Sequence, residues 1–237
     1  MKVSIFIPCF IDQLFPNVAV AMVKILRKLG QKVDYNPKQS CCGQPAFNSG
    51  FWEESSKVAT KFVKDMQGEA VIVCPSASCV GFIKNQLAKI LPTSELQKSA
   101  QLVANRIWEF SDYLVNYLKI ENVGAVLAGK AIYHDSCSAL RECQIKTAPR
   151  ILLHNVTGLE LHEVSDCEVC CGFGGSFAVK FEPISVAMAE QKVENAIAKN
   201  ANFIISTDMS CLMHLDGYIK FKQYPIQVLH IAEVLNK

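Results

Sequence analysis

Cysteine is the residue type whose number and spacing point most directly to chemistry in this sequence. The chain of 237 residues contains 11 cysteines. In the first half, 31 residues separate Cys9 from Cys41, Cys42 follows at once, and a further 36 residues separate Cys42 from Cys79. Because thiolates bind metals and carry redox chemistry, this set of four indicates a metal or redox centre.

A second set of four cysteines in the other half repeats this arrangement. Here 32 residues separate Cys137 from Cys170, Cys171 follows at once, and 39 residues separate Cys171 from Cys211. In both sets a glycine follows the adjacent pair and a serine precedes the last cysteine. Chance would rarely align these landmarks twice in one order, so the sequence predicts an internal duplication.

Four converging thiolates suit either a structural zinc ion or an iron–sulfur cluster. Zinc ribbons usually carry two Cys-x-x-Cys pairs, whereas adjacent cysteines tend to diverge from a single tetrahedral ion. A cluster several ångströms across offers a separate iron to each thiol. The adjacent pairs therefore favour two iron–sulfur clusters, one per repeat, over zinc, catalytic thiols or structural cysteines, with zinc as the alternative in protein prepared in air. The predicted ligands are Cys9, Cys41, Cys42, Cys79, Cys137, Cys170, Cys171 and Cys211.

The elements that must position these cysteines follow from the hydrophobic periodicity, in which strands alternate with helices in both halves. This order predicts an α/β fold of two duplicated units, with mainly parallel sheets flanked by helices. The first repeat is expected over residues 1–125 and the second over residues 126–237. The expected strands are Lys2–Pro8, Lys32–Tyr35, Ala70–Cys74, Lys130–His134, Leu159–Val164, Phe203–Ser206 and Ile226–Leu229. The expected helices are Asn17–Leu29, Phe51–Met66, Cys79–Leu91, Glu95–Asn105, Ile107–Ile120, Thr147–Val156, a helical pattern from the loop Cys171–Gly175 through Lys199, Cys211–Lys220 and a terminal helix.

This fold explains where the cysteines stand along the chain. In parallel sheets, ligands bind beyond the carboxyl ends of the strands. Cys9 and Cys137 follow predicted strands directly, and Cys79 and Cys211 lie just beyond later ones. The last two also stand near helix starts, where free amides and the helix dipole favour the thiolate form.

Three cysteines and two histidines lie outside this pattern. Cys74 ends a buried strand and Cys143 lies on a predicted helix, so core packing is the favoured interpretation for both. Cys167, three residues before an adjacent pair, is a candidate spare ligand. His214 is expected to be a surface residue of a helix beside the site, and His134 a hydrogen-bonding residue near the cluster.

Composition narrows the class of protein. Half the residues are apolar, 19% are charged, and the formal net charge is +2, which indicates a globular protein and argues against a nucleic-acid partner. No apolar run approaches the roughly 18 residues of a membrane-spanning helix. The N-terminal apolar stretch runs into Asp12 and predicts a buried strand, not an export signal, so a reducing cytoplasmic location is expected.

The motifs around the cysteines carry a family resemblance that covers nearly the whole chain. The chain resembles the cysteine-rich "CCG" domain of the heterodisulfide reductase B subunit and the glycolate oxidase iron–sulfur subunit. It is most similar to the lactate utilisation protein A group. The motifs are Cys41-Cys42-Gly43, Pro75-Ser76-Ala77-Ser78-Cys79, His134-Asp135-Ser136-Cys137, Cys170-Cys171-Gly172-Phe173-Gly174-Gly175 and Ser206-Thr207-Asp208-Met209-Ser210-Cys211.

One departure from the fuller family pattern bears on the type of cluster. That pattern ends each repeat in Cys-x-x-Cys, whereas this chain has Ser76 and Asp208 in place of the first of those cysteines. The resemblance therefore implies four-thiolate clusters of the 4Fe-4S type in preference to five-thiolate ones.

The resemblance also implies a function. It predicts an iron–sulfur electron-transfer subunit of a cytoplasmic complex that oxidises L-lactate to pyruvate, with the other subunits of that complex as partners. Asn48–Glu54 is a candidate partner surface. Two alternatives stay open: a thiol–disulfide reductase subunit of the heterodisulfide type, and a zinc-stapled interaction module.

Overall fold

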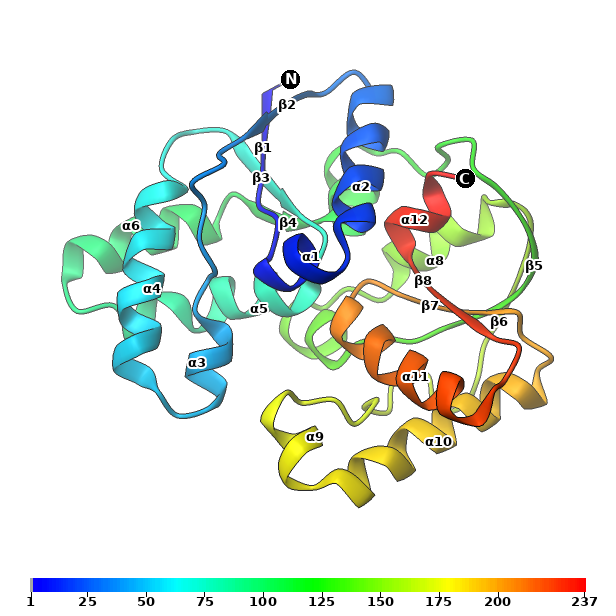
Figure 1. The fold of residues 1–237 in the computed structure, drawn as a ribbon. Helices are drawn as coiled ribbons and strands as arrows, with labels where there is room; N and C mark the ends of the chain where they lie inside the picture. Colours follow the sequence, from blue (N-terminus) through cyan, green and yellow to red (C-terminus); the bar gives the residue numbers. More distant parts are fainter. Residues whose placement is uncertain (1) are drawn as a thin grey trace.

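The computed structural model describes residues 2–237, which form two four-stranded sheets (Figure 1). The first sheet has the strand order β2-β1-β3-β4 and the second has the order β6-β5-β7-β8. All neighbouring strands pair in parallel, which confirms the predicted α/β class. The strands are β1 (Lys2–Ile5), β2 (Lys32–Tyr35), β3 (Val71–Cys74), β4 (Ile107–Glu109), β5 (Val126–Tyr133), β6 (Thr157–His162), β7 (Phe203–Ser206) and β8 (Gln227–His230).

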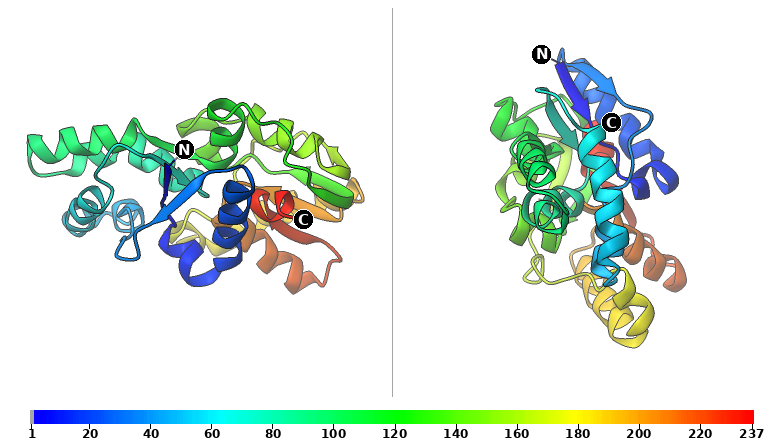
Figure 2. Two further views of the ribbon diagram at one scale, coloured as in Figure 1. Left: turned by 90° about the horizontal axis from the view of Figure 1, so that it is seen from above. Right: turned by 90° about the vertical axis from the view of Figure 1, so that its left-hand side faces the viewer.

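Helices connect the strands and flank both sheets (Figure 2). Parallel neighbours require such crossovers, because the chain must return to the other end of the sheet before it can pair again. Among residues 2–237, no helix is long and apolar enough to cross a membrane. The helices of the first half are α1 (Cys9–Leu14), α2 (Pro16–Lys28), α3 (Gln44–Asn48), α4 (Trp52–Asp65), α5 (Ala77–Asn85), η1 (Leu87–Ile90), α6 (Ser94–Ala104), α7 (Phe110–Asp112) and the π-helical turn η2 (Tyr113–Tyr117). Those of the second half are the π-helical turn η3 (Ser138–Glu142), α8 (Thr147–His154), α9 (Ser176–Lys180), α10 (Glu182–Ala198), α11 (Met209–Lys222) and α12 (Ile231–Leu235).

One predicted element is wrong. The helix expected over Ile107–Ile120 begins as strand β4, and helical structure starts only at Phe110. The strand forms because its residues pair with β3, with Cys74 opposite Glu109. A run of three residues is too short to show a period of its own, so the helical pattern that follows it dominated the prediction.

Each repeat places its last helical segment against the other repeat. Helix α12, which follows β8, packs on α2, and α7 and η2, which follow β4, pack on α8. Figure 1 shows α12 beside α2. Buried side chains of both repeats, from Met22 and Ile25 to Leu153 and Leu235, belong to one continuous apolar core. The two repeats are therefore joined through their cores as well as through the chain.

This shared core predicts that damage in the second repeat destabilises the first. Leu235→Ala removes a side chain that is 3% exposed, and we expect it to lower the free energy of unfolding by about 2–5 kcal/mol. Both tryptophans, Trp52 and Trp108, lie in the first repeat. Urea unfolding followed by tryptophan fluorescence should therefore shift together with the transition seen by circular dichroism.

The matched control is Leu102→Ala, at a residue 63% exposed, which should change neither transition. A fluorescence transition that stays in place while the circular dichroism transition of Leu235→Ala moves would contradict the coupling of the repeats.

Candidate metal centres

The first four predicted cysteines come from three connections at one edge of the first sheet. Cys9 begins α1 after β1, Cys41 and Cys42 lie in the loop between β2 and α3, and Cys79 lies in the first turn of α5 after β3. Strands β2, β1 and β3 are neighbours and parallel, so their carboxyl ends meet at this edge.

The structure brings these four thiols together as a chain of contacts. Thiol–thiol hydrogen bonds join Cys9 to Cys41, Cys41 to Cys42, and Cys42 to Cys79. The chain runs from the surface inward, because Cys9 is exposed and Cys42 is 1% exposed. One end of the first quartet is thus accessible from outside, and the other lies in the core.

The second quartet has the same order of contacts. Cys137 bonds to Cys170, Cys170 to Cys171, and Cys171 to Cys211. Cys137 directly precedes η3, the adjacent pair lies in the loop before α9, and Cys211 lies in the first turn of α11. The duplication seen in the sequence is therefore a duplication of sites.

Backbone amides donate hydrogen bonds to the adjacent cysteines of both quartets. The Gly43 amide donates to Cys41 Sγ and the Gly172 amide to Cys170 Sγ, each at 3.4 Å. The next amide along each loop donates to the second cysteine of the pair. Hydrogen bonds to the charged form favour it, so these amides stabilise thiolates.

The glycine after each pair has a structural reason. Gly43 and Gly172 adopt φ values of 97° and 93°, which favour glycine. A Cβ atom would lie 3.0 Å from the Ser55 carbonyl oxygen at the first and 2.6 Å from the Ser185 carbonyl oxygen at the second. Each serine hydroxyl also donates to the carbonyl of its glycine, at 2.9 and 2.8 Å. The close approach of the next helix thus requires glycine here.

The electrostatics of the quartets favour a bound cation. Hydrogen bonds from the Cys137 and Cys171 thiols lower the pKa of Cys170 to about 2. The hydrogen bond between Cys9 and Cys41, and then burial, raise the pKa of Cys9. One thiolate is therefore stabilised by its neighbours, but four adjacent thiolates repel one another unless a metal lies among them. The donor sets fit a four-thiolate iron–sulfur cluster and also a zinc ion.

The three remaining cysteines lie outside these chains of contacts. Cys74 is fully buried in the apolar core of the first repeat, as predicted. The Cys143 thiol packs between the repeats and lies 3.5 Å from the Ala77 carbonyl oxygen. Cys167, the candidate spare ligand, lies near Asp135 and Arg150.

The two positions that depart from the fuller family motif begin helices. Ser76 precedes α5 and Asp208 precedes α11, where the Asp208 carboxylate accepts a hydrogen bond from the Ser210 hydroxyl at 2.8 Å. The same carboxylate accepts the Ser78 amide of the first repeat at 2.9 Å. Asp208 therefore links the two helices that carry Cys79 and Cys211, a role that the sequence analysis did not predict.

Two histidines lie beside the second quartet. His214 Nε2 lies 3.1 Å from the Ser185 hydroxyl, so His214 supports the glycine loop and is half-buried instead of standing free on the surface. His134 is 1% exposed, and its ring nitrogen and the sulfurs of Cys171 and Cys211 all lie within 4.8 Å of one another. The position of His134 at a strand end was the only signal for this role in the sequence.

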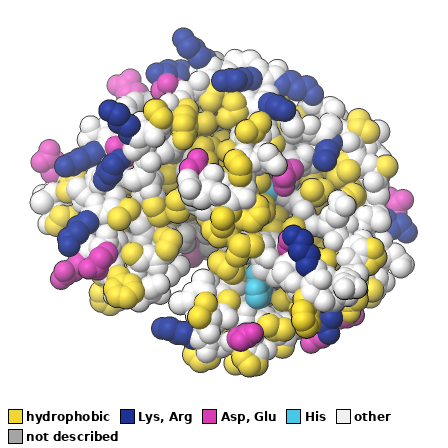
Figure 3. Space-filling model, in the orientation of Figure 1, with side chains coloured by type: hydrophobic (Ala, Val, Ile, Leu, Met, Phe, Trp, Pro, Cys, Tyr) yellow, Lys and Arg dark blue, Asp and Glu magenta, His cyan; other side chains and the backbone are white. Residues whose placement is uncertain are grey.

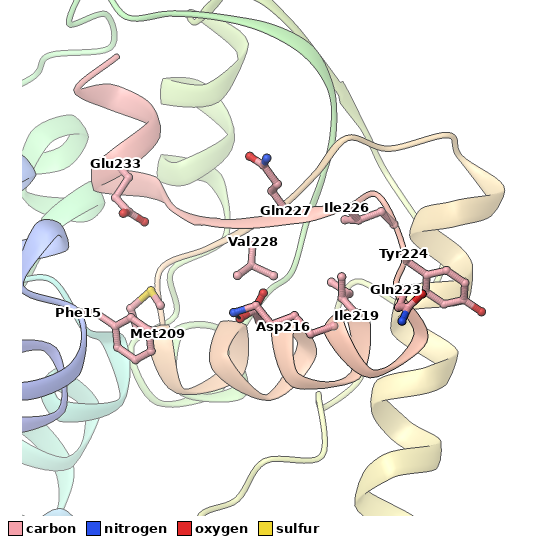
Figure 4. Close-up of a pocket in the computed structure, with 11 residues that line it drawn as sticks. Phe15, Met209, Asp216, Ile219, Gln223, Tyr224, Ile226, Gln227, Val228 and Glu233 are labelled. Carbon is pink, nitrogen blue, oxygen red and sulfur yellow. Dashed lines mark ion pairs between the residues drawn. The ribbon is translucent and has the colours of Figure 1, made fainter.

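A pocket of about 600 Å³ lies beside α11 and β8 (Figure 4). Phe15 and Met209 line one end of it, and Tyr224 the other. None of the eight predicted ligand cysteines, all of them within the described part of the chain, lines this pocket. The cysteine centres are thus separate from it.

Three similarities connect the chain to known proteins. A protein-family model described as CCG, cysteine-rich domain, matches residues 3–84 and again residues 131–216. Over its whole length the chain is 40% identical to "Lactate utilization protein A" of Geobacillus sp. (strain WCH70), of which it covers 99%. It is 42% identical to the protein of that name from Bacillus pumilus (strain SAFR-032), again covering 99%. In fold it resembles the crystal structure of a hypothetical protein from Helicobacter pylori, with a TM-score of 0.61 at 11% identity; the chain spans 49% of that protein.

The two quartets predict independent loss of metal. Cys42→Ser should empty the first site and leave the second loaded, and Cys171→Ser should do the converse, because a hydroxyl is a much poorer ligand than a thiolate. Serine is close in size to cysteine, so the loss of packing should be modest. Iron and acid-labile sulfide, measured after anaerobic purification, should fall by about half in each variant.

Cys74→Ser is the matched control, since Cys74 is as buried as Cys42 but lies outside the quartet. It should leave the iron content unchanged. If Cys74→Ser removed half of the iron, the first quartet would be wrongly assigned.

Proposed function

We propose that this chain, which belongs to the cysteine-rich CCG domain family, acts in lactate utilisation as the iron–sulfur electron-transfer subunit of a complex that oxidises L-lactate to pyruvate. The observation that carries the proposal is the pair of matching four-thiol chains, in a protein that aligns from end to end with relatives named lactate utilisation protein A. Each quartet would hold one cluster, and the clusters would relay electrons. The lactate itself would be oxidised on a partner subunit.

The chemistry of lactate oxidation suits a subunit with two one-electron centres. Conversion of L-lactate to pyruvate releases two electrons and two protons. A 4Fe-4S cluster passes one electron at a time, so two clusters together accommodate the electrons of one turnover. The residues of this chain would hold the clusters, stabilise their thiolates through the loop amides, and shield all but one edge from water.

The exposure of the sites supports exchange of electrons with other proteins. Cys9 is exposed, and Cys137 and Cys170 are half-buried, so both sites have an accessible edge. Phe51 and Phe181 stand at corresponding places, directly before α4 and α10, and are 61% and 51% exposed. Apolar side chains gather over the middle of the face shown in Figure 3. Such surfaces suit the partner subunits that the proposal requires, in a cytoplasmic complex.

Metal analysis of anaerobically purified protein tests the cluster part of this proposal. We expect brown protein that contains iron and acid-labile sulfide in equal amounts. Zinc in stoichiometric amount without sulfide would replace the redox role with a structural one. Reduction of a disulfide substrate by the isolated chain would instead favour the thiol–disulfide reductase.

Growth tests the lactate part. Deletion of the gene should abolish growth on L-lactate and leave growth on glucose unchanged. The wild-type gene should restore growth on lactate, whereas a gene carrying both Cys42→Ser and Cys171→Ser should not. Normal growth of the deletion strain on L-lactate would overturn the assignment to lactate.

A further inference from the structure

The two sites differ at a pair of corresponding buried positions. Three residues before the first cysteine of each quartet stands Phe6 in one repeat and His134 in the other. Seven residues after the serine that holds the glycine loop stands Phe62 in one repeat and Lys192 in the other. All four side chains are at most 2% exposed. The duplicated sites therefore have different walls.

The wall of the first site is apolar. The rings of Phe6 and Phe62 meet edge to face, with centroids 4.8 Å apart. Both belong to the same buried apolar cluster as Cys42. Neither ring can donate a conventional hydrogen bond to a cluster sulfur.

The wall of the second site contains a hydrogen-bond donor without a partner. Neither ring nitrogen of His134 has a hydrogen-bond partner within residues 2–237, although both are buried. An imidazole carries at least one N–H in any protonation state. Because the ring lies within 4.8 Å of the Cys171 and Cys211 sulfurs, the group that would satisfy it is the one held by those cysteines.

Lys192 contributes less to the difference between the sites. Its ammonium lies 3.5 Å from the Asp166 carboxylate, and it also donates to the Asp166 carbonyl oxygen. Both residues are buried, so the two charges largely cancel. The donor that sets the second site apart is therefore His134.

We propose that His134 donates a hydrogen bond to a sulfur of the second cluster and thereby holds that cluster at a higher reduction potential than the first. Hydrogen bonds to cluster and ligand sulfurs stabilise the reduced, more negative state and raise the potential. An electron supplied by the partner would then pass from the reduced first cluster, which is oxidised, to the second cluster, which is reduced. This inference rests on the proposed function only in that both sites hold clusters.

The test is a redox titration of the anaerobically purified full chain, followed by EPR. Cys171→Ser and Cys42→Ser provide the first and second clusters separately, so that each potential is assigned. The second cluster should have the higher potential. His134→Phe, made with Cys42→Ser, should weaken reduction of the second cluster about tenfold, or ~59 mV for one electron. Phe6→His, made with Cys171→Ser, should shift the first cluster upward.

His154→Phe, at an exposed residue, is the matched control and should shift neither potential. Equal potentials in the two single-cluster proteins, or an unchanged potential in a loaded His134→Phe protein, would overturn the proposal. Pulsed EPR of protein labelled with ¹⁵N-histidine provides a readout that does not need the variant to fold. A weak nitrogen coupling in the second cluster supports the hydrogen bond. The absence of coupling, or a coupling as strong as that of a directly bonded nitrogen, would overturn it.

These outcomes separate the inference from the function on which it rests. Protein without iron and sulfide defeats the proposed function itself. Loaded protein with equal potentials defeats only the role of His134.

Discussion

Mutual repulsion among closely packed thiolates is the constraint around which each half of this molecule is arranged. Four sulfurs in a chain of contacts need a cation between them and donors around them. The loop amides at Gly43 and Gly172 supply donors. Supplying the sulfurs from 31 and 36 residues apart requires strands whose carboxyl ends meet, which the parallel order β2-β1-β3 provides. Fold and site are thus two aspects of one requirement.

The same constraint explains how the repeats are joined. The helices that carry Cys79 and Cys211 begin at Ser76 and Asp208, and the Asp208 carboxylate accepts an amide from each helix start. Its negative charge acts on thiols of both quartets, Cys79 and Cys137. One carboxylate therefore lies close to both sites. The exchange of terminal helices, α12 onto α2 and α7 onto α8, keeps this junction out of water.

The sequence predicted the quartets and most strands because spacing and periodicity are local properties of the chain. It did not predict β4, because three residues that pair only with β3 carry no period, although the matching strand β8 was predicted. The unpartnered state of His134 could not be predicted, since it depends on what the folded chain places around the ring. Alignment of the repeats by their cysteines would nevertheless have revealed the contrast between Phe6 and His134.

Duplication of a site gives two copies of one chemistry, and what a relay adds to this is direction. The contacts that create the thiolate environment are retained in both repeats: the cysteine chain, the glycine with positive φ, and the serine that holds it. These contacts determine whether a metal centre can form. The residues that differ, Phe6 and His134, surround the thiols without belonging to the quartets, and they act on how strongly a centre holds an electron. The repeats therefore share the contacts needed for binding and differ in those that would order the two potentials.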